Sequence, residues 1–231
     1  KYQTKLWITT VKYRGLLMAK FGRHQFRSIV LRHVEETGAR IFRSVGFTPN
    51  SITLIGGSIS LAGAFFIAYG YVLLGAIIFL IGSSLDMMDG ALARITKSTT
   101  KFGGVLDSLV DRLSEASIFT AISIYAIRSD IGVTRLLSLI VLVFLSLTSS
   151  QIVSYLRSKG ESLGIKTDVG IMTRPERIIV IFIGLVINLR SLEISLVVIS
   201  TMSIVTAMQR LIHIRRNLKE DQKTSGVIIT S

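Results

Sequence analysis

Four aspartates, Asp86, Asp89, Asp107 and Asp111, lie at or near the ends of two apolar stretches of this chain. A carboxylate is costly to expose to hydrocarbon, so acids in such places turn toward water, a cation or one another. Asp86 and Asp89 are three residues apart and Asp107 and Asp111 four apart, so each pair lies on one helix face. Two such faces can hold one or two hard divalent cations. The pattern predicts a divalent-metal site, which is a kind of site that serves chemistry on phosphates.

The residues around the acids suit a phosphate-bearing ligand. Gly90 and Ala93 are small and lie on the same helix face, which leaves room beside the carboxylates. Arg94, Lys97 and Lys101 add positive charge next to them. The chain has no cysteine and only three scattered histidines, so its metal ligands must be oxygen atoms. Mg2+ and Mn2+ are cations that such ligands favour.

A structural role and a transport role for the four acids both stay open at this point. In a structural role they form intramembrane ion pairs, Asp89 with Arg94 or Asp111 with Arg112, although the arginines are too few to neutralise four carboxylates. In a transport role they belong to a cation-coupled membrane transporter. Transporters bind ions near the bilayer midplane, often between paired broken helices, whereas these acids lie on two linked helices at one face. We therefore favour the metal site.

The same residues belong to a longer motif. It reads D-x2-D-G-x2-A-R-x8-G-x3-D-x3-D and is formed by Asp86, Asp89, Gly90, Ala93, Arg94, Gly103, Asp107 and Asp111. The motif resembles the signature of the CDP-alcohol phosphatidyltransferase family at every fixed position. Members of that family displace CMP from a CDP-linked lipid with an alcohol. The resemblance implies a metal-dependent membrane transferase of phospholipid biosynthesis that forms a homodimer.

The resemblance also implies roles for individual residues. The four aspartates would hold two ions, Mg2+ or Mn2+, and Asp111 would also take the proton from the attacking hydroxyl. The residues that match CDP-lipid-binding positions are Asn50, Ser51, Ile52, Thr53, Gly90, Arg94 and Thr100. Thr48 and Pro49 read as a helix N-cap and first helical residue. The free backbone amides of that helix start would suit a phosphate. The alternative is that Pro49 only starts the helix and has no part in binding.

The acceptor alcohol has to be inferred from the second half of the chain. Residues 149–178 are unusually polar for a segment between two spans, and Thr173 with Glu176 forms a capping-box pattern at a helix start. Three motifs resemble those of the phosphatidylinositol phosphate synthases of actinobacteria, and they lie at 154–161, 174–177 and 209–210. This further resemblance predicts inositol 1-phosphate as the acceptor and CDP-diacylglycerol as the donor.

Basic residues would then hold the acceptor phosphate. The resemblance assigns this role to Arg157, Arg177 and Arg210. Three positive charges also suit a phosphate that carries two negative charges. Lys159 and Arg174 are attributed instead to the general excess of positive charge on cytoplasmic loops. Glycerol 3-phosphate, the acceptor of phosphatidylglycerophosphate synthases, would want the same basic pocket and is the alternative within the family.

Six apolar stretches must position these residues. They run at about 51–69, 71–86, 104–127, 133–155, 177–189 and 191–209. Several reach the ~20 residues that cross a bilayer as a helix. Gly70-Tyr71 and the polar segment 188–191 predict two tight helical hairpins. The expected fold class is all-α, an integral membrane bundle of six transmembrane helices preceded by an amphipathic juxtamembrane helix. That helix, within 26–46, lies on an anionic membrane face or packs on the bundle.

The distribution of charge predicts the orientation in the membrane. Of the 27 lysines and arginines, only Arg128, Arg135 and Arg190 fall on the side away from the four aspartates. The positive-inside rule therefore places both termini and the active site in the cytoplasm, in a multi-pass protein of the cell (inner) membrane. The net charge of +13 is explained by this topology, so no nucleic-acid partner is expected.

The expected organisation has three parts. Residues 1–48 form a cytoplasmic N-terminal segment with no secretory signal, 49–216 form the six-helix catalytic domain, and 217–231 form a disordered tail. Small residues such as Gly56, Ser60 and Gly82 are expected to pack helices together or to pack the two protomers of a homodimer.

Overall fold

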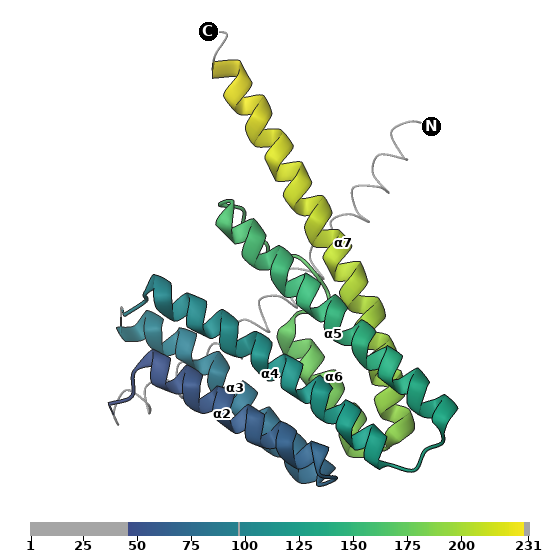
Figure 1. Ribbon diagram of the computed structural model, residues 1–231. Coiled ribbons are helices and arrows are strands. Elements are labelled where there is room, and N and C mark those ends of the chain that lie inside the picture. Colours follow the sequence, from purple (N-terminus) through teal and green to yellow (C-terminus); the bar gives the residue numbers. More distant parts are fainter. Residues whose placement is uncertain (1–45, 97, 229–231) are drawn as a thin grey trace, which may run out of the picture.

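Residues 46–96 and 98–228 are described by the computed structural model, and within them the chain forms helices and no strand (Figure 1). The helices are α2 (Pro49–Ala68), α3 (Val72–Thr96), α4 (Lys101–Arg128), α5 (Val133–Ser162), α6 (Arg174–Ile187) and α7 (Leu189–Ile228). Each of the apolar stretches corresponds to one of them, so the all-α fold class is confirmed. The expected amphipathic helix falls almost entirely on residues 1–45, which lie outside the described part.

Local sequence signals set the helix ends. The Thr48 side chain accepts a backbone N–H of the first turn of α2 at 3.2 Å, with Pro49 next to it. Gly70, at φ 94°, makes the turn between α2 and α3, a conformation that favours glycine. Thr173 and Glu176 form the predicted capping box at the start of α6.

α2 and α3 pack closely because small residues face one another. A Cβ on Gly75 would lie 2.6 Å from the carbonyl oxygen of Gly63, and one on Gly82 would lie 2.7 Å from that of Gly56. The side chain of Ser60 is buried beside Gly82 in the same interface. The expected packing role of these small residues is confirmed between α2 and α3.

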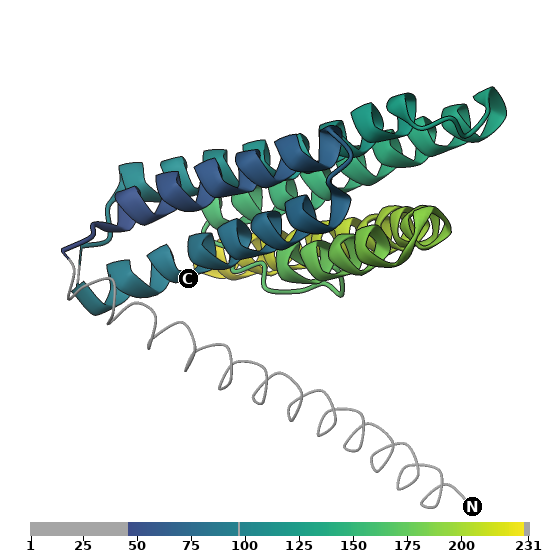
Figure 2. The same cartoon turned by 90° about the horizontal axis from the view of Figure 1, so that it is seen from below.

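The last three helices form a second group, with α7 lying against both α5 and α6. The two groups meet where α4 contacts α5 and α3 contacts α6 (Figure 2). Within the second group, Ser146 of α5 donates a hydrogen bond to the carbonyl oxygen of Leu196 in α7, at 2.9 Å. Arg135 and Glu193 join the same two helices by an ion pair of 2.7 Å. These contacts hold α5 and α7 as one wall of the site described below.

The outer surface of the bundle is apolar. Large side chains such as Phe65, Phe144 and Ile194 are 57%, 65% and 65% exposed. Among the described residues, α2, α5 and the part of α7 from Leu189 to Lys219 are long and apolar enough to cross a membrane, whereas the apolar part of α3 is shorter. Such an outer surface suits contact with lipid rather than water.

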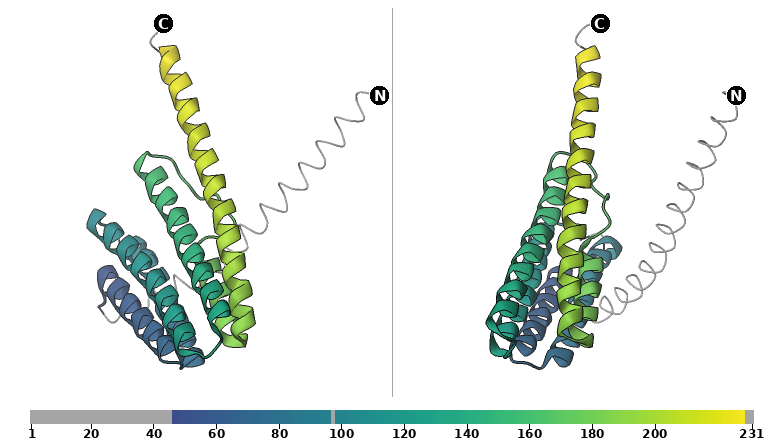
Figure 3. Two further views of the ribbon diagram at one scale, coloured as in Figure 1. Left: turned by 45° about the vertical axis from the view of Figure 1, so that its right-hand side comes forward. Right: turned by 90° about the vertical axis from the view of Figure 1, so that its right-hand side faces the viewer.

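The C-terminal region differs from the sequence-based expectation. We expected the chain from 217 onward to be a disordered tail, but α7 continues to Ile228 and projects beyond the other helices (Figure 3). Hydropathy marks where the apolar face of a helix ends, not where the helix ends. Residues 219–223 are all charged or polar, and most of them are straight-chain residues that favour helix in water as well.

Candidate active site

The topology brings the two polar regions of the chain that the sequence analysis singled out to one end of the bundle. α3 and α5 finish at this end, whereas α2, α4 and α6 begin there. Asp107 and Asp111 are therefore brought to the same region as the 149–178 segment, although the two are far apart in sequence. α7 passes this end as it projects from the bundle (Figure 3). Two adjoining cavities form there, and Asp107 lines both of them.

The first cavity, here called the α2–α4 cavity, has a volume of about 250 Å³. Its lining comes from the start of α2, the end of α3 and the start of α4, and comprises Pro49, Asn50, Thr53, Asp89, Ala93, Ser98, Thr99, Thr100, Gly103, Gly104 and Asp107. Asp89 is 6% exposed and accepts a hydrogen bond from the hydroxyl of Thr53. That bond fixes one carboxylate of α3 against α2 at the cavity wall.

The predicted CDP-lipid residues separate into groups. Asn50, Thr53 and Thr100 line the α2–α4 cavity, and their binding of a CDP-lipid stays a prediction. Ile52 is instead 1% exposed in the apolar core, and Ser51 is in the N-terminal turn of α2, bonded to Thr48. Neither belongs to the cavity lining, because successive residues of a helix point in different directions. The Arg94 side chain and the surroundings of Gly90 are outside the described part of the chain.

A glycine allows the connection between α3 and α4 to approach α2. A Cβ on Gly103 would lie 3.0 Å from the Thr100 hydroxyl and 3.1 Å from the side-chain oxygen of Asn50. Thr100 caps α4 by accepting the N–H of Gly103 at 2.9 Å. The glycine in the motif thus has a steric role, because it leaves space for the polar atoms of the cavity.

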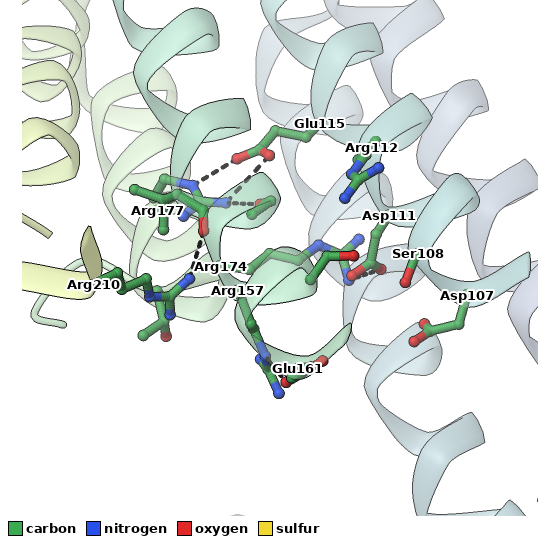
Figure 4. Close-up of a pocket in the computed structure, with 14 residues that line it drawn as sticks. Asp107, Ser108, Asp111, Arg112, Glu115, Arg157, Glu161, Arg174, Arg177 and Arg210 are labelled. Carbon is green, nitrogen blue, oxygen red and sulfur yellow. Dashed lines mark hydrogen bonds and ion pairs between the residues drawn. The ribbon is translucent and has the colours of Figure 1, made fainter. Parts of the chain in front are cut away.

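The second cavity, here called the arginine cavity, has a volume of about 190 Å³ (Figure 4). It is lined by Asp107, Ser108, Asp111, Arg112, Glu115, Val153, Ser154, Arg157, Ser158, Glu161, Thr173, Arg174, Arg177 and Arg210. All three arginines predicted to hold the acceptor phosphate are in this set, beside two of the motif aspartates. A phosphate bound by the arginines would therefore lie next to Asp107 and Asp111.

Arg177 lies on α6 and is 1% exposed. Its guanidinium donates two hydrogen bonds to the carboxylate of Glu115 on α4, at 2.6 and 3.2 Å. It also donates to the carbonyl oxygen of Met172 at 3.2 Å and to the hydroxyl of Ser154 at 3.4 Å. The buried charge is thus matched by an opposite charge and by backbone, as a buried ion pair requires.

Arg210, on α7, holds the connection between α5 and α6. It donates to the carbonyl oxygen of Val169 at 2.9 Å and to that of Val153 at 2.6 Å. Thr206, one turn earlier, accepts the N–H groups of Ile171 and Met172 at 3.2 and 3.0 Å. The guanidinium of Arg210 therefore has a fixed position between a helix and a loop, near the charges of Arg157 and Arg177 (Figure 4).

Two further arginines of the cavity are paired with acids. Arg157 donates to Glu161, one turn later on α5, at 2.9 Å, and both side chains are about half exposed. Arg174, the first residue of α6, forms an ion pair with Asp111 of α4. The sequence suggested Arg112 as the cation that would pair with Asp111 if the acids formed ion pairs. The structure places a cation from a different helix there.

The carboxylates fit a hard cation by their chemistry. Asp89, Asp107 and Asp111 present oxygen donors to adjoining cavities, and oxygen is what Mg2+ and Mn2+ prefer. The side chain of Asp86, the fourth expected ligand, lies outside the described part. Among the described residues, no three acidic, histidine or cysteine side chains form a group tight enough to hold a metal as they stand. The four-aspartate metal site therefore stays a prediction.

Glu115, Arg174 and Thr206 shape the site but were given no role in it from the sequence. Glu115 continues the four-residue spacing of Asp107 and Asp111 along α4, and this spacing was a signal that could have identified it. Arg174 was attributed to membrane topology, although it lines the cavity. Thr206 lies in an apolar span with no motif around it, so only the folded chain shows that it holds the loop.

The fold and the two cavities define an all-helical membrane protein that can hold a phosphate-bearing molecule beside carboxylates. The model of the CDP-alcohol phosphatidyltransferase family matches residues 47–209. Archaetidylinositol phosphate synthase of Pyrococcus horikoshii is 36% identical over 197 residues, which cover 84% of this chain and 97% of the relative. Phosphatidylinositol phosphate synthase of Mycolicibacterium smegmatis is 32% identical over 178 residues, covering 74% of this chain and 78% of the relative.

Solved structures show the same likeness. The phosphatidylinositol phosphate synthase of Mycobacterium tuberculosis with CDP-DAG bound has a TM-score of 0.68 and 29% identity, covering 79% of this chain and 94% of that one. The same enzyme in complex with manganese and citrate also has a TM-score of 0.68 and 29% identity, covering 78% and 88%. This chain therefore belongs to the CDP-alcohol phosphatidyltransferase family and is a membrane transferase of phospholipid biosynthesis. Membership excludes the transporter alternative.

Proposed function

We propose that this protein transfers the phosphatidyl group of CDP-diacylglycerol to a hydroxyl of inositol 1-phosphate, forming phosphatidylinositol phosphate and releasing CMP. The observation that carries the proposal is the arginine cavity, which brings Arg157, Arg177 and Arg210 together beside Asp111. The relatives above are named as synthases of archaetidylinositol phosphate and of phosphatidylinositol phosphate, and these names support the same acceptor. The solved relative with CDP-DAG bound supports the donor.

The cavities suggest how the chain would arrange the reaction. The CDP group would occupy the α2–α4 cavity, where Asn50, Thr53 and Thr100 offer polar side chains. The acceptor phosphate would occupy the arginine cavity, because guanidinium groups bind phosphate oxygens with good geometry. The two substrates would then meet at Asp107, which lines both cavities. Holding both reactants in this way supplies much of the acceleration of a bimolecular reaction.

Asp111 is proposed as the general base. It lies in the arginine cavity, where the acceptor hydroxyl would point away from its phosphate and toward α4. The hydroxyl oxygen forms a bond to the lipid-linked phosphorus while its proton passes to Asp111. The bond from that phosphorus to the oxygen of CMP breaks, and CMP leaves with the electron pair.

The metal ions are proposed to be held by Asp86, Asp89, Asp107 and Asp111, as two Mg2+ or Mn2+ ions. The manganese complex of the solved relative supports use of a divalent cation in this family. When bound, such ions neutralise the pyrophosphate and stabilise the negative charge of the departing CMP. Thr53 holds Asp89 in place for this role by its hydrogen bond.

The membrane arrangement is part of the same proposal. All six helices α2–α7 are proposed to span the membrane within the domain 49–216, with the site and both termini in the cytoplasm of a homodimeric inner-membrane protein. The apolar outer surface and the length of α2, α5 and α7 support spanning. The cluster of basic residues at the end that carries the site supports the orientation.

An acceptor screen tests the proposed reaction. Purified protein with CDP-diacylglycerol and Mg2+ is expected to release CMP with inositol 1-phosphate, and far less with glycerol 3-phosphate or free inositol. The physical reason is that the arginine cavity requires a phosphate, while its remaining polar lining has to match the ring hydroxyls. Release with glycerol 3-phosphate alone would instead make the protein a phosphatidylglycerophosphate synthase.

The Arg210→Ala variant tests the placement of the acceptor. Loss of one charged hydrogen-bond donor should raise the KM for inositol 1-phosphate by roughly 10- to 100-fold. The KM for CDP-diacylglycerol should stay within about twofold, because Arg210 does not line the α2–α4 cavity. Lys159→Ala removes an exposed charge of α5 that lines neither cavity, and it serves as the matched control. Equal rises in both KM values for Arg210→Ala would contradict the placement.

A further inference from the structure

Arg174 is held at a defined position by the start of α6. The capping box formed by Thr173 and Glu176 fixes the backbone on either side of it, with Pro175 in the first turn. From there its side chain crosses to α4 and pairs with Oδ1 of Asp111. The Arg174 and Asp111 side chains are 18% and 29% exposed, so the pair lies in the wall of the arginine cavity (Figure 4).

The partners of Arg174 differ in kind from those of the other deep arginines. Arg177 is bonded to Glu115, and Arg210 is bonded to backbone carbonyl oxygens. None of those partners is a residue that the proposed function assigns to a metal ion. Arg174 is paired with Asp111, the carboxylate that the proposed function assigns to a metal ion and to proton transfer.

A guanidinium and a metal ion compete for the same carboxylate. A divalent cation bound by Asp107 and Asp111 would neutralise these carboxylates and repel the positive charge of Arg174. The closest place for a displaced guanidinium is the cavity that Arg174 already lines, where a phosphate would attract it. Metal binding and acceptor binding would then be linked through one side chain.

We propose that Arg174 is a positioning residue that exchanges between two anions. It pairs with Asp111 before the metal ion binds and with the acceptor phosphate afterwards. This inference rests on the proposed metal site at Asp111. In the first position the residue neutralises negative charge at Asp111, in the cavity that Asp107 also lines. In the second it completes the group of arginines around the phosphate. By thermodynamic linkage, metal ion and acceptor each strengthen the binding of the other.

The test measures Mn2+ binding by electron paramagnetic resonance in the absence of substrates. We expect Arg174→Gln to bind Mn2+ about two- to fivefold more tightly than the wild type, the effect of removing a competing, partly exposed ion pair. Arg174→Lys keeps the charge and should bind Mn2+ nearly as the wild type does. Lys159→Gln removes an exposed charge from α5 and controls for a general change in electrostatic potential.

A second measurement follows the acceptor. Calorimetric titration with inositol 1-phosphate should show tighter binding when Mn2+ is present in the wild type, and a smaller effect of Mn2+ in Arg174→Gln. Thermal unfolding in detergent establishes that the variants are folded. A structural role alone would not tighten metal binding, so this combination separates positioning from stability.

Each contrary result has a separate meaning. The inference is overturned if Arg174→Gln binds Mn2+ no more tightly than Lys159→Gln does, or more weakly than the wild type does. Either result would leave the proposed metal site intact. Tighter Mn2+ binding with an unchanged effect on the acceptor also overturns the exchange. If the wild type binds no Mn2+, the proposed metal site fails, and the inference fails with it.

Discussion

The Asp111→Asn variant is expected to lose turnover by about 100- to 10,000-fold, the range that a positioned general base contributes. The amide has nearly the shape of the carboxylate but cannot take the proton of the acceptor hydroxyl, and it binds a divalent cation poorly. CMP release at saturating substrates measures the loss. Binding of CDP-diacylglycerol should persist in part, because Asn50, Thr53 and Thr100 line a cavity that does not include Asp111.

A matched variant separates this effect from a general loss of negative charge. Asp130→Asn changes an exposed acid between α4 and α5, outside both cavities, and should leave turnover unchanged. An Asp111→Asn protein that works as fast as the wild type would remove Asp111 from the base role. Complete loss of CDP-lipid binding would show that the residue acts on the donor instead.

The Glu115→Ala variant is expected to destabilise the protein by about 3–5 kcal/mol, because it leaves Arg177 buried without its opposite charge. Glu115 and Arg177 join α4 to α6 across the arginine cavity, and both are buried. Thermal unfolding in detergent measures the loss of stability. The acceptor KM should also rise, because the position of Arg177 depends on this bond.

Two variants control this prediction. Glu161→Ala breaks the half-exposed pair with Arg157 and should cost no more than about 1 kcal/mol. The double variant Glu115→Leu with Arg177→Met replaces the buried pair by apolar groups and should recover much of the stability. Its acceptor KM should stay high, since the guanidinium is gone. Recovery of both stability and KM would show that Arg177 has no part in binding the acceptor.

The sequence predicted the fold class and the shared location of Asp107 and Asp111. Apolar stretches gave the helix order, because a chain in lipid must form its hydrogen bonds within helices. The spacing of Asp107 and Asp111 placed both on one face of α4, and the structure has both in the arginine cavity. The match at 50–53 was less exact, since Ile52 is in the core. A contiguous match cannot tell which side of a helix faces the ligand.

The basic half of the site depends on contacts that no local pattern contains. Arg157, Arg177 and Arg210 lie on three different helices, and their meeting was inferred by resemblance. Glu115 and Arg174 are brought opposite their partners only because the fold places α4 and the start of α6 on facing sides of the arginine cavity. An arginine in a cytoplasmic loop and one that faces a carboxylate look alike in sequence. Tertiary structure is needed to separate these roles.

The arginine cavity is central to the proposed function, because it would select inositol 1-phosphate as the acceptor. The most direct measurement is mass spectrometry of the lipid formed when inositol 1-phosphate and glycerol 3-phosphate are offered together at equal concentration, with CDP-diacylglycerol and Mg2+. We expect the lipid carrying an inositol phosphate headgroup to be the main product. A main product carrying glycerophosphate, or no phospholipid product from either acceptor, would contradict the proposed function.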